Sequence, residues 1–282
     1  MSLIDQLLQF TTASVATPQG AVQYRRATTP GHTSGVTHVL LHGIGSASGN
    51  WLGQLLAAST VNGCSSDVLA WDAPGYGASE ALPMAHPRAA DYAARMWAWL
   101  DALNVDVAQP LTLVGHSLGA LMAAAATAQA PQRVRRLFLL APAPGYGTAE
   151  AHVREKKLSD RLANLAQLGP AGMAQKRAAW MLSAQATGDQ VALVEHMMAR
   201  VHVHGYTQAN HMLANGDLAS DLARVACPVT IASGSADTIT SAEGCEALAR
   251  QIGTPYVSLG AVGHSCALEA PAVVNTLLGL AP

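Results

Sequence analysis

The chain has 282 residues, of which 50% are hydrophobic and 12% are charged, and this composition is typical of a folded protein with a large apolar core. Lys and Arg number 16 against 18 Asp and Glu, and the sequence has no basic stripe, which argues against nucleic acid as a partner. The opening segment MSLIDQLLQF lacks the basic start of a signal peptide, and no segment approaches the ~20 uninterrupted apolar residues of a membrane span. We therefore expect a cytoplasmic protein with no membrane partner.

Short apolar runs recur along the chain and predict the strands of a sheet. After an N-terminal section with a hairpin expected around Gly20, these runs cover residues 36–41, 68–71, 111–114, 134–140, 229–232 and 256–259. Continuous apolar runs of this length are typical of buried, mostly parallel strands.

Helical stretches alternate with these runs. They cover residues 50–58, 89–104, 118–130, 241–251 and 273–280. Helices in these positions are the usual crossover connections between parallel strands, and they cover both faces of a sheet. The sequence therefore predicts an α/β fold with a doubly wound, mostly parallel sheet.

The region from Pro144 to Ser220 breaks this alternation, because it contains no convincing strand. Apolar residues recur there at helical spacing in two places: Leu158, Leu162 and Leu165, and then Val191, Val194, Met198 and Val201. Gly169-Pro170, Gly188 and Gly205 interrupt the region. A helical insertion beside the crevice at the carboxyl ends of strands is typical of a cap over a binding site. We expect a core in residues 1–143 and 221–282 and a helical cap in residues 144–220.

Ser117 lies at the apex of a predicted strand, turn and helix, LTLVGHSLGALMAAAATAQA, over residues 111–130. Gly115 and Gly119 lack the Cβ atoms that would clash across such a sharp elbow. A serine hydroxyl is a poor nucleophile by itself, so a catalytic serine must be held beside a base and near backbone N–H donors. This setting makes Ser117 the candidate nucleophile, with a structural turn and an incidental serine as the alternative.

The partners that a serine nucleophile needs follow later in the chain. Asp237 follows the predicted strand VTIAS in the loop GSADTIT, and His264 follows the strand YVSLG in the loop AVGHSCALEAP. Both residues therefore sit at strand carboxyl ends, which is the edge where Ser117 emerges. A histidine can act as the base, and a carboxylate can fix its tautomer and stabilise the imidazolium.

Five segments together resemble the sequence landmarks of the α/β-hydrolase superfamily over essentially the whole chain: LLHGIGSASGNW, WDAPGYGAS, VGHSLGA, GSADTIT and GHSCALEAP. The resemblance implies an α/β-hydrolase fold without a cofactor, in which Ser117 is the nucleophile, His264 the general base and Asp237 the acid. It also implies an oxyanion hole made by the backbone N–H groups of Ile44 and Leu118. Because position 117 is a serine, the chain differs from the haloalkane dehalogenase and epoxide hydrolase branches, which place an aspartate there.

Other polar residues in these segments have structural interpretations. We expect His116 to pack behind the elbow, His42 to brace the oxyanion loop and Asp72 to support its own turn. Three further histidines invite a metal interpretation: His202, His204 and His211. No carboxylate or cysteine completes a ligand set around them, so we predict no metal site.

The four cysteines have no CxxC spacing, which predicts reduced thiols and neither a disulfide framework nor a zinc site: Cys64, Cys227, Cys245 and Cys266. Cys266 lies two residues after His264 and could face the site there. A buried, small apolar side chain is the interpretation that we prefer for Cys266.

The cap carries the candidates for an apolar substrate pocket. We expect Trp180, Met181 and Met198 to line it, together with Tyr146, although such side chains at helical spacing are also usual in a cap core. Cationic residues of the cap could bind a substrate carboxylate, but a solvated helix face is the preferred interpretation of each: Arg154, Lys156, Lys157, Arg161, Arg177 and Arg200.

The sequence thus predicts a serine hydrolase that cleaves a small-molecule carboxylic ester, lactone or thioester through a Ser117 acyl-enzyme. The resemblance leaves two alternatives: a C–C bond hydrolase of aromatic-ring catabolism or a cofactor-free, haloperoxidase-like enzyme. C–C hydrolases often have Trp directly after the catalytic histidine, where this chain has Ser265. A ligand receptor on the same fold is the non-enzymatic alternative, and it would need a pocket but no aligned nucleophile and base. The acyl group, the leaving group and a homo-oligomeric state stay open.

Overall fold

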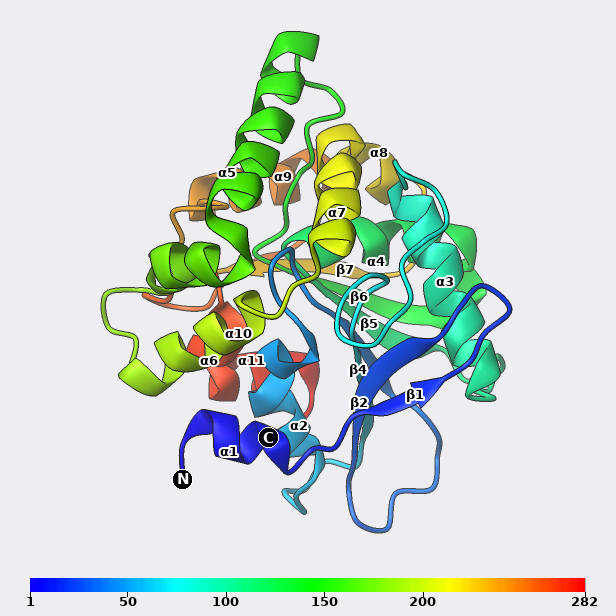
Figure 1. Cartoon of the computed structure of the whole chain (residues 1–282). Coiled ribbons are helices and arrows are strands. Elements are labelled where there is room, and N and C mark those ends of the chain that lie inside the picture. The colour runs from blue at the N-terminus through cyan, green and yellow to red at the C-terminus, as the bar shows by residue number, and fades with distance from the viewer. Residues whose placement is uncertain (282) are drawn as a thin grey trace.

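A computed structural model describes residues 1–281 and has one sheet of eight strands, in the order β1-β2-β4-β3-β5-β6-β7-β8 (Figure 1). The strands are β1 (Ala13–Val15), β2 (Val22–Thr28), β3 (His38–Leu41), β4 (Asp67–Trp71), β5 (Leu111–His116), β6 (Val134–Leu140), β7 (Val229–Ser233) and β8 (Tyr256–Ser258). Only β1 with β2 and β2 with β4 pair antiparallel among these strands, and all other neighbours are parallel. The predicted doubly wound, mostly parallel sheet is confirmed.

Helices cover both faces of this sheet. They are α1 (Leu3–Leu8), α2 (Leu52–Ala58), α3 (Ala89–Ala102), α4 (Leu118–Gln129), α8 (Leu218–Leu222), α9 (Ala242–Ile252), α10 (Cys266–Glu269) and α11 (Pro271–Leu278), with short 3-10 turns η1 (Ser48–Trp51) and η2 (Pro131–Arg133). Successive strand side chains point to opposite faces, so Val39 and Leu41 join one apolar cluster with α3, α4 and α9, while Leu40 joins a second cluster with α2, α10 and α11.

Between β6 and β7, all the regular secondary structure of the described chain is helical. This stretch contains α5 (Ala151–Arg177), η3 (Ala178–Met181), α6 (Gly188–Met198), α7 (Val203–Asn215) and α8. We call residues 144–220 the cap segment. Figure 1 shows α5, in green, rising away from the sheet with α7 beside it. A third apolar cluster, which includes Leu7, Leu52, Leu193 and Met197, packs the cap segment against α1 and α2.

Helix α5 is broken near its middle. Gly169 has φ 62° and ψ 174°, a backbone conformation that is essentially restricted to glycine, and Pro170 follows it. Proline has no N–H to donate to the preceding turn, so the helical hydrogen bonds are interrupted there. The break divides α5 into two helical halves with different axes.

Among the helices of residues 1–281, none combines the length and the hydropathy that crossing a membrane requires.

Candidate active site

Ser117 occupies a sharp turn between β5 and α4. Its φ of 53° and ψ of −115° lie in a region that residues with a side chain rarely adopt. A Cβ on Gly119 would collide with the carbonyl oxygen of Leu41, and a Cβ on Gly115 would collide with the carbonyl oxygen of Gly119. The two glycines therefore let α4 start directly against the sheet, which leaves the serine at the tip of the turn.

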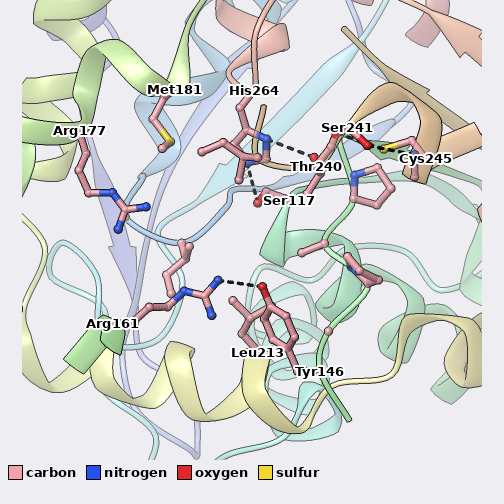
Figure 2. A pocket seen from close by; sticks show the side chains of 18 of the residues that line it. Ser117, Tyr146, Arg161, Arg177, Met181, Leu213, Thr240, Ser241, Cys245 and His264 are labelled. Atoms are coloured by element: carbon pink, nitrogen blue, oxygen red, sulfur yellow. Dashed lines mark hydrogen bonds between the residues drawn. The ribbon is translucent and has the colours of Figure 1, made fainter. Parts of the chain in front are cut away.

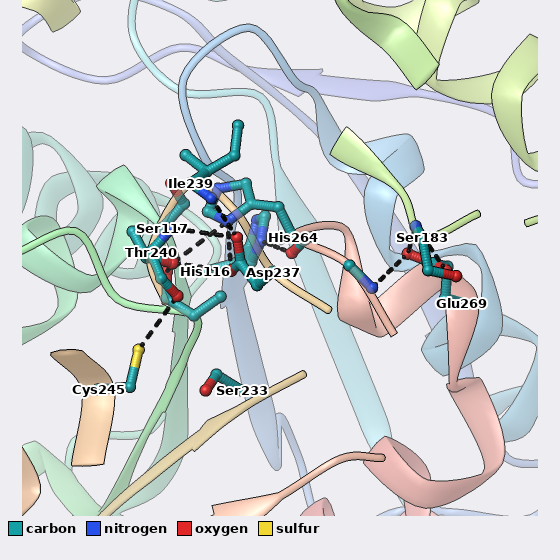
Figure 3. A network of polar contacts seen from close by, with 12 residues as sticks. His116, Ser117, Ser183, Ser233, Asp237, Ile239, Thr240, Cys245, His264 and Glu269 are labelled. Atoms are coloured by element: carbon teal, nitrogen blue, oxygen red, sulfur yellow. Dashed lines mark hydrogen bonds and ion pairs between the residues drawn. The ribbon is translucent and has the colours of Figure 1, made fainter. Parts of the chain in front are cut away.

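The structure brings Ser117, His264 and Asp237 into hydrogen-bond contact (Figure 3). His264 Nε2 lies 2.9 Å from Ser117 Oγ, and His264 Nδ1 lies 2.9 Å from Asp237 Oδ2. Asp237 follows β7 and His264 lies between β8 and α10, so parallel pairing from β5 to β8 places all three residues at one edge of the sheet. With the Nδ1 proton directed at Asp237, Nε2 is free to accept the serine proton.

Asp237 is held in its ionised form by its surroundings. Burial raises its pKa, but the hydrogen bonds from His264 and from the N–H groups of Ile239 (2.7 Å) and Thr240 (3.0 Å) outweigh burial, so the pKa lies below its usual value. The carboxylate can therefore stabilise an imidazolium on His264.

Two contacts of this network were not predicted from the sequence. Thr240 Oγ1 lies 2.9 Å from Asp237 Oδ2 and 3.0 Å from the carbonyl oxygen of Ala141. His116 Nε2 lies 2.8 Å from the backbone oxygen of His264. Burial, the largest cause, lowers the pKa of His116 to about 3, so this imidazole is neutral and supports the His264 loop. The only sequence signal for Thr240 was its place three residues after the acid, a spacing common in turns built on Asp.

Two backbone N–H groups are available to a developing oxyanion. Leu118 is the first residue of α4, where helical N–H groups have no partner inside the helix. Ile44 lines the cavity beside Ser117. Within residues 1–281, neither the Ile44 nor the Leu118 N–H donates a hydrogen bond. These are the two positions expected from the family resemblance.

His42 and Asp72 lie behind the oxyanion loop rather than in the cavity. His42 Nε2 accepts a hydrogen bond from the Ala73 N–H (3.0 Å), and its Nδ1 lies 2.8 Å from the Gly43 oxygen. Burial lowers the pKa of His42 and keeps it neutral. Asp72 Oδ1 accepts from the Ser48 N–H at 2.7 Å. Both side chains thus fix the loop that carries Ile44.

A cavity of about 310 Å³ opens in front of Ser117 and His264 (Figure 2). Tyr146, Met181 and Met198 line it, as expected for the substrate pocket. Trp180 does not: its side chain is 61% exposed and lies outside the cavity lining, in contrast to the expectation from the sequence. Both Trp180 and Met181 belong to the short helix η3, where consecutive side chains point in different directions, and the turn presents Met181 to the cavity.

The cavity also contains two positive charges, for which the sequence favours a solvated helix face. Arg161 and Arg177, both from α5, line the cavity. Of the described residues that line it, none is Asp or Glu. Helical spacing alone could not show this, because the break at Gly169 changes which side of the part of α5 after the break faces the cavity.

All four cysteines are free thiols. Cys245 lines the cavity, and burial raises its pKa to about 11, so it is a neutral thiol. Cys266 is fully buried in the core and burial raises its pKa as well. In the part of the chain that the structure describes, no three His, Cys, Asp or Glu side chains gather in a way that could hold a metal ion.

Comparison with known proteins places this geometry in a family. A family model described as serine aminopeptidase, S33, matches residues 35–262. The chain belongs to this family. The match confirms the α/β-hydrolase superfamily that the sequence landmarks indicated.

Relatives in this superfamily have similar lengths and folds. The (E)-2-((N-methylformamido)methylene)succinate hydrolase of Acinetobacter baylyi is 27% identical over 241 residues, which cover 84% of this chain and 86% of the relative. The 3-oxoadipate enol-lactonase 2 of the same organism is 25% identical, with 74% of this chain and 75% of the relative covered. The structure of the enol-lactonase from Burkholderia xenovorans LB400 matches with a TM-score of 0.81 at 22% identity, over 95% of this chain and 99% of that one. The chain is thus a small-molecule α/β hydrolase.

Proposed function

We propose that this protein hydrolyses a small-molecule carboxylic ester, lactone or thioester through an acyl-enzyme on Ser117. The observation that carries the proposal is the pair of contacts from Ser117 Oγ to His264 Nε2 and from His264 Nδ1 to Asp237 Oδ2, each of 2.9 Å, beside a cavity that Ser117 and His264 line. A receptor would need the cavity but not this alignment.

The first half of the reaction forms the acyl-enzyme. Ser117 Oγ attacks the substrate carbonyl while its proton passes to His264 Nε2, and the negative charge on the carbonyl oxygen is met by the N–H groups of Ile44 and Leu118. When the tetrahedral intermediate collapses, the alkoxide, enolate or thiolate leaves and takes the proton from His264. Asp237 stabilises the imidazolium between these two steps.

The second half releases the acid. Water enters the cavity, His264 takes its proton, and the resulting hydroxide attacks the acyl carbonyl. Collapse returns the proton from His264 to Ser117 Oγ and frees the carboxylic acid. His42 and His116 take no part in these transfers, because burial keeps both neutral and both are engaged with backbone groups.

Relatives support this reaction class. One is named as the hydrolase of a substituted succinate and another as an enol-lactonase. Both descriptions fit acyl cleavage of a small substrate, which the cavity volume of about 310 Å³ also suits.

Covalent labelling tests the proposed nucleophile. A fluorophosphonate should add one label per chain at Ser117, and Ser117→Ala should take up none, as intact mass spectrometry and peptide mapping would show. The same variant should lose several orders of magnitude in kcat on 4-nitrophenyl acetate while its thermal unfolding stays close to that of the wild type. Labelling at another residue, or turnover that survives Ser117→Ala, would refute the proposal.

A further inference from the structure

Two arginine side chains form a cationic wall in the substrate cavity, and we use this name for Arg161 and Arg177. Figure 2 shows both side chains reaching into the cavity from the side opposite to Thr240 and Cys245. Both residues are half-buried. Neither has an ion pair within residues 1–281, whereas five other Arg or Lys side chains pair with an Asp or Glu: Arg26, Arg133, Lys156, Arg224 and Arg250.

The cationic wall has no counter-ion among the described residues that line the cavity. Apart from these two guanidinium groups and the catalytic histidine, the cavity is lined mostly by apolar side chains such as Met173, Met181 and Leu213. Charges that are partly removed from water and lack a counter-ion destabilise a fold. A bound anion would restore the missing interactions.

Arg161 is also fixed in position. Its Nη2 donates to Tyr146 Oη at 3.2 Å, and its guanidinium carbon lies 5.2 Å from the centre of the Tyr146 ring. The backbone N–H of Tyr146 in turn donates to the oxygen of Leu213 on α7. A side chain that is held in this way loses less conformational freedom when it binds a ligand.

The break in α5 is what allows both arginines to face one cavity. In an unbroken α-helix, Arg161 and Arg177 would lie roughly 24 Å apart along the axis and would point in directions roughly 160° apart. The break at Gly169 and Pro170 turns the second half of the helix. The cationic wall therefore depends on a backbone feature that costs helical hydrogen bonds.

We propose that the substrate carries a carboxylate remote from the scissile carbonyl, and that Arg161 and Arg177 bind it. This inference rests on the proposed function, because it names the substrate class of the same site. Guanidinium groups present paired N–H donors that match a carboxylate, and such charge-assisted bonds are about twice as strong as neutral ones. The apolar surface between the cationic wall and Ser117 suits the carbon chain that joins the two ends of the substrate.

Matched substrates test the proposal. We would measure kcat/KM on 4-nitrophenyl monoesters of straight-chain dicarboxylic acids of increasing length, and on esters of equal length whose far end is a primary amide. The best carboxylate-terminated ester should exceed its amide counterpart by about tenfold to a hundredfold. Acetyl esters of ω-hydroxy acids and of their amides repeat the comparison with the carboxylate in the leaving group.

Variants identify the side chains responsible for the preference for a carboxylate-terminated ester. Arg161→Met and Arg177→Met should each lower the ratio of carboxylate to amide activity by about tenfold or more. Lys176→Met is the matched control: it removes a positive charge from the neighbouring position of α5, but Lys176 is exposed and lies outside the cavity lining, so the ratio should stay unchanged.

Binding to Ser117→Ala, measured by calorimetry, separates this proposal from the proposed function. A carboxylate-terminated ester should bind at least about tenfold more tightly than its amide counterpart to a chain that cannot form an acyl-enzyme. If this preference is found but the wild type does not turn the esters over, the proposed reaction is wrong and the carboxylate site stands. Equal binding and equal turnover of the two series, or an equal loss of preference in Lys176→Met, would overturn the carboxylate site.

Discussion

Three buried histidines surround Ser117, and their environments differ. His42 and His116 form hydrogen bonds only with backbone groups, and burial lowers the pKa of each. Only His264 has a carboxylate at one ring nitrogen and a hydroxyl at the other. The sequence could predict that Ser117, Asp237 and His264 meet because the glycine pattern around Ser117 and the loops after two strands are local features.

Other residues of the site could not be predicted, because their positions depend on packing between distant segments. Thr240 reaches Asp237 and Ala141 at once only when β6 and β7 pair. Trp180 and Arg177 are close in sequence, yet the arginine lines the cavity and the tryptophan faces solvent. Side-chain type alone favours the opposite arrangement, with the tryptophan in the cavity and the arginine in solvent.

Asp237→Asn should lower kcat by roughly 10⁴-fold with little change in KM, because an amide that donates to His264 Nδ1 would hold the wrong tautomer. Steady-state kinetics on a 4-nitrophenyl ester would measure both constants. Asp72→Asn is the control, since Asp72 bonds to the Ser48 N–H behind the oxyanion loop and contacts no reacting group. Loss of kcat in Asp72→Asn, with near-normal kcat in Asp237→Asn, would show that the acid has been misassigned.

At the scale of elements, apolar runs located the strands well because parallel strands are buried on both faces. The run at residues 134–140 coincides with β6, and the others differ from the observed strands by one or two residues. The sequence could not predict which face of each helix in the cap segment points toward the cavity. Gly169 and Pro170 mark an interruption in the sequence, but they do not specify the angle between the two halves of α5, and that angle decides which side chains reach the cavity.

A carboxylate joins the cap segment to the loop that carries His264. Glu269, at the end of α10, accepts hydrogen bonds from the N–H of Gly263 (2.8 Å) and from the N–H of Ser183 (3.0 Å), as Figure 3 shows. The Ser265 N–H donates to the oxygen of Met181 at 2.7 Å. The end of η3 and the His264 loop are thus tied side by side.

Glu269→Ala should lower the free energy of unfolding by about 1–3 kcal/mol, because it leaves two N–H groups without an acceptor. It should also lower kcat, since the His264 loop loses a support. Glu269→Gln keeps one acceptor oxygen and should recover most of both losses. Urea unfolding and ester kinetics would measure the two effects. An alanine variant as stable and active as the wild type would show that the contact has no structural role.

For the whole molecule, buried histidines predict how stability depends on pH. Burial lowers the pKa of His38 to about 4 and that of His116 to about 3, and it lowers the pKa of His42 too. The unfolded chain takes up these protons near pH 6.5, whereas the folded chain does not. Stability should therefore be complete above pH 6.5 and fall toward pH 4, by up to about 1.4 kcal/mol per pH unit for each histidine. Asp237 adds nothing in this window, because its contribution is lost only below its ordinary pKa of 3.8.

Denaturant unfolding at several pH values between 7 and 5 would measure this slope. His38 is a suitable position for a variant, because it lies in β3, bonds to the Leu278 oxygen and is distant from the reacting groups. His38→Gln should lower the slope of unfolding free energy against pH by the contribution of one histidine, even if it also changes the stability at pH 7. An unchanged slope in this variant would contradict the prediction.

The order of the strands in the chain has a consequence for biosynthesis. Ser117 precedes His264 by 147 residues, and His264 follows β8, a strand of three residues at the edge of the sheet that pairs with β7. A serine without its base is a weak nucleophile. We therefore expect Ser117 to be unreactive in a nascent or partly folded chain, in which His264 does not yet contact it. If the proposed ester hydrolysis is correct, we expect its onset during refolding to report when β8 has paired with β7.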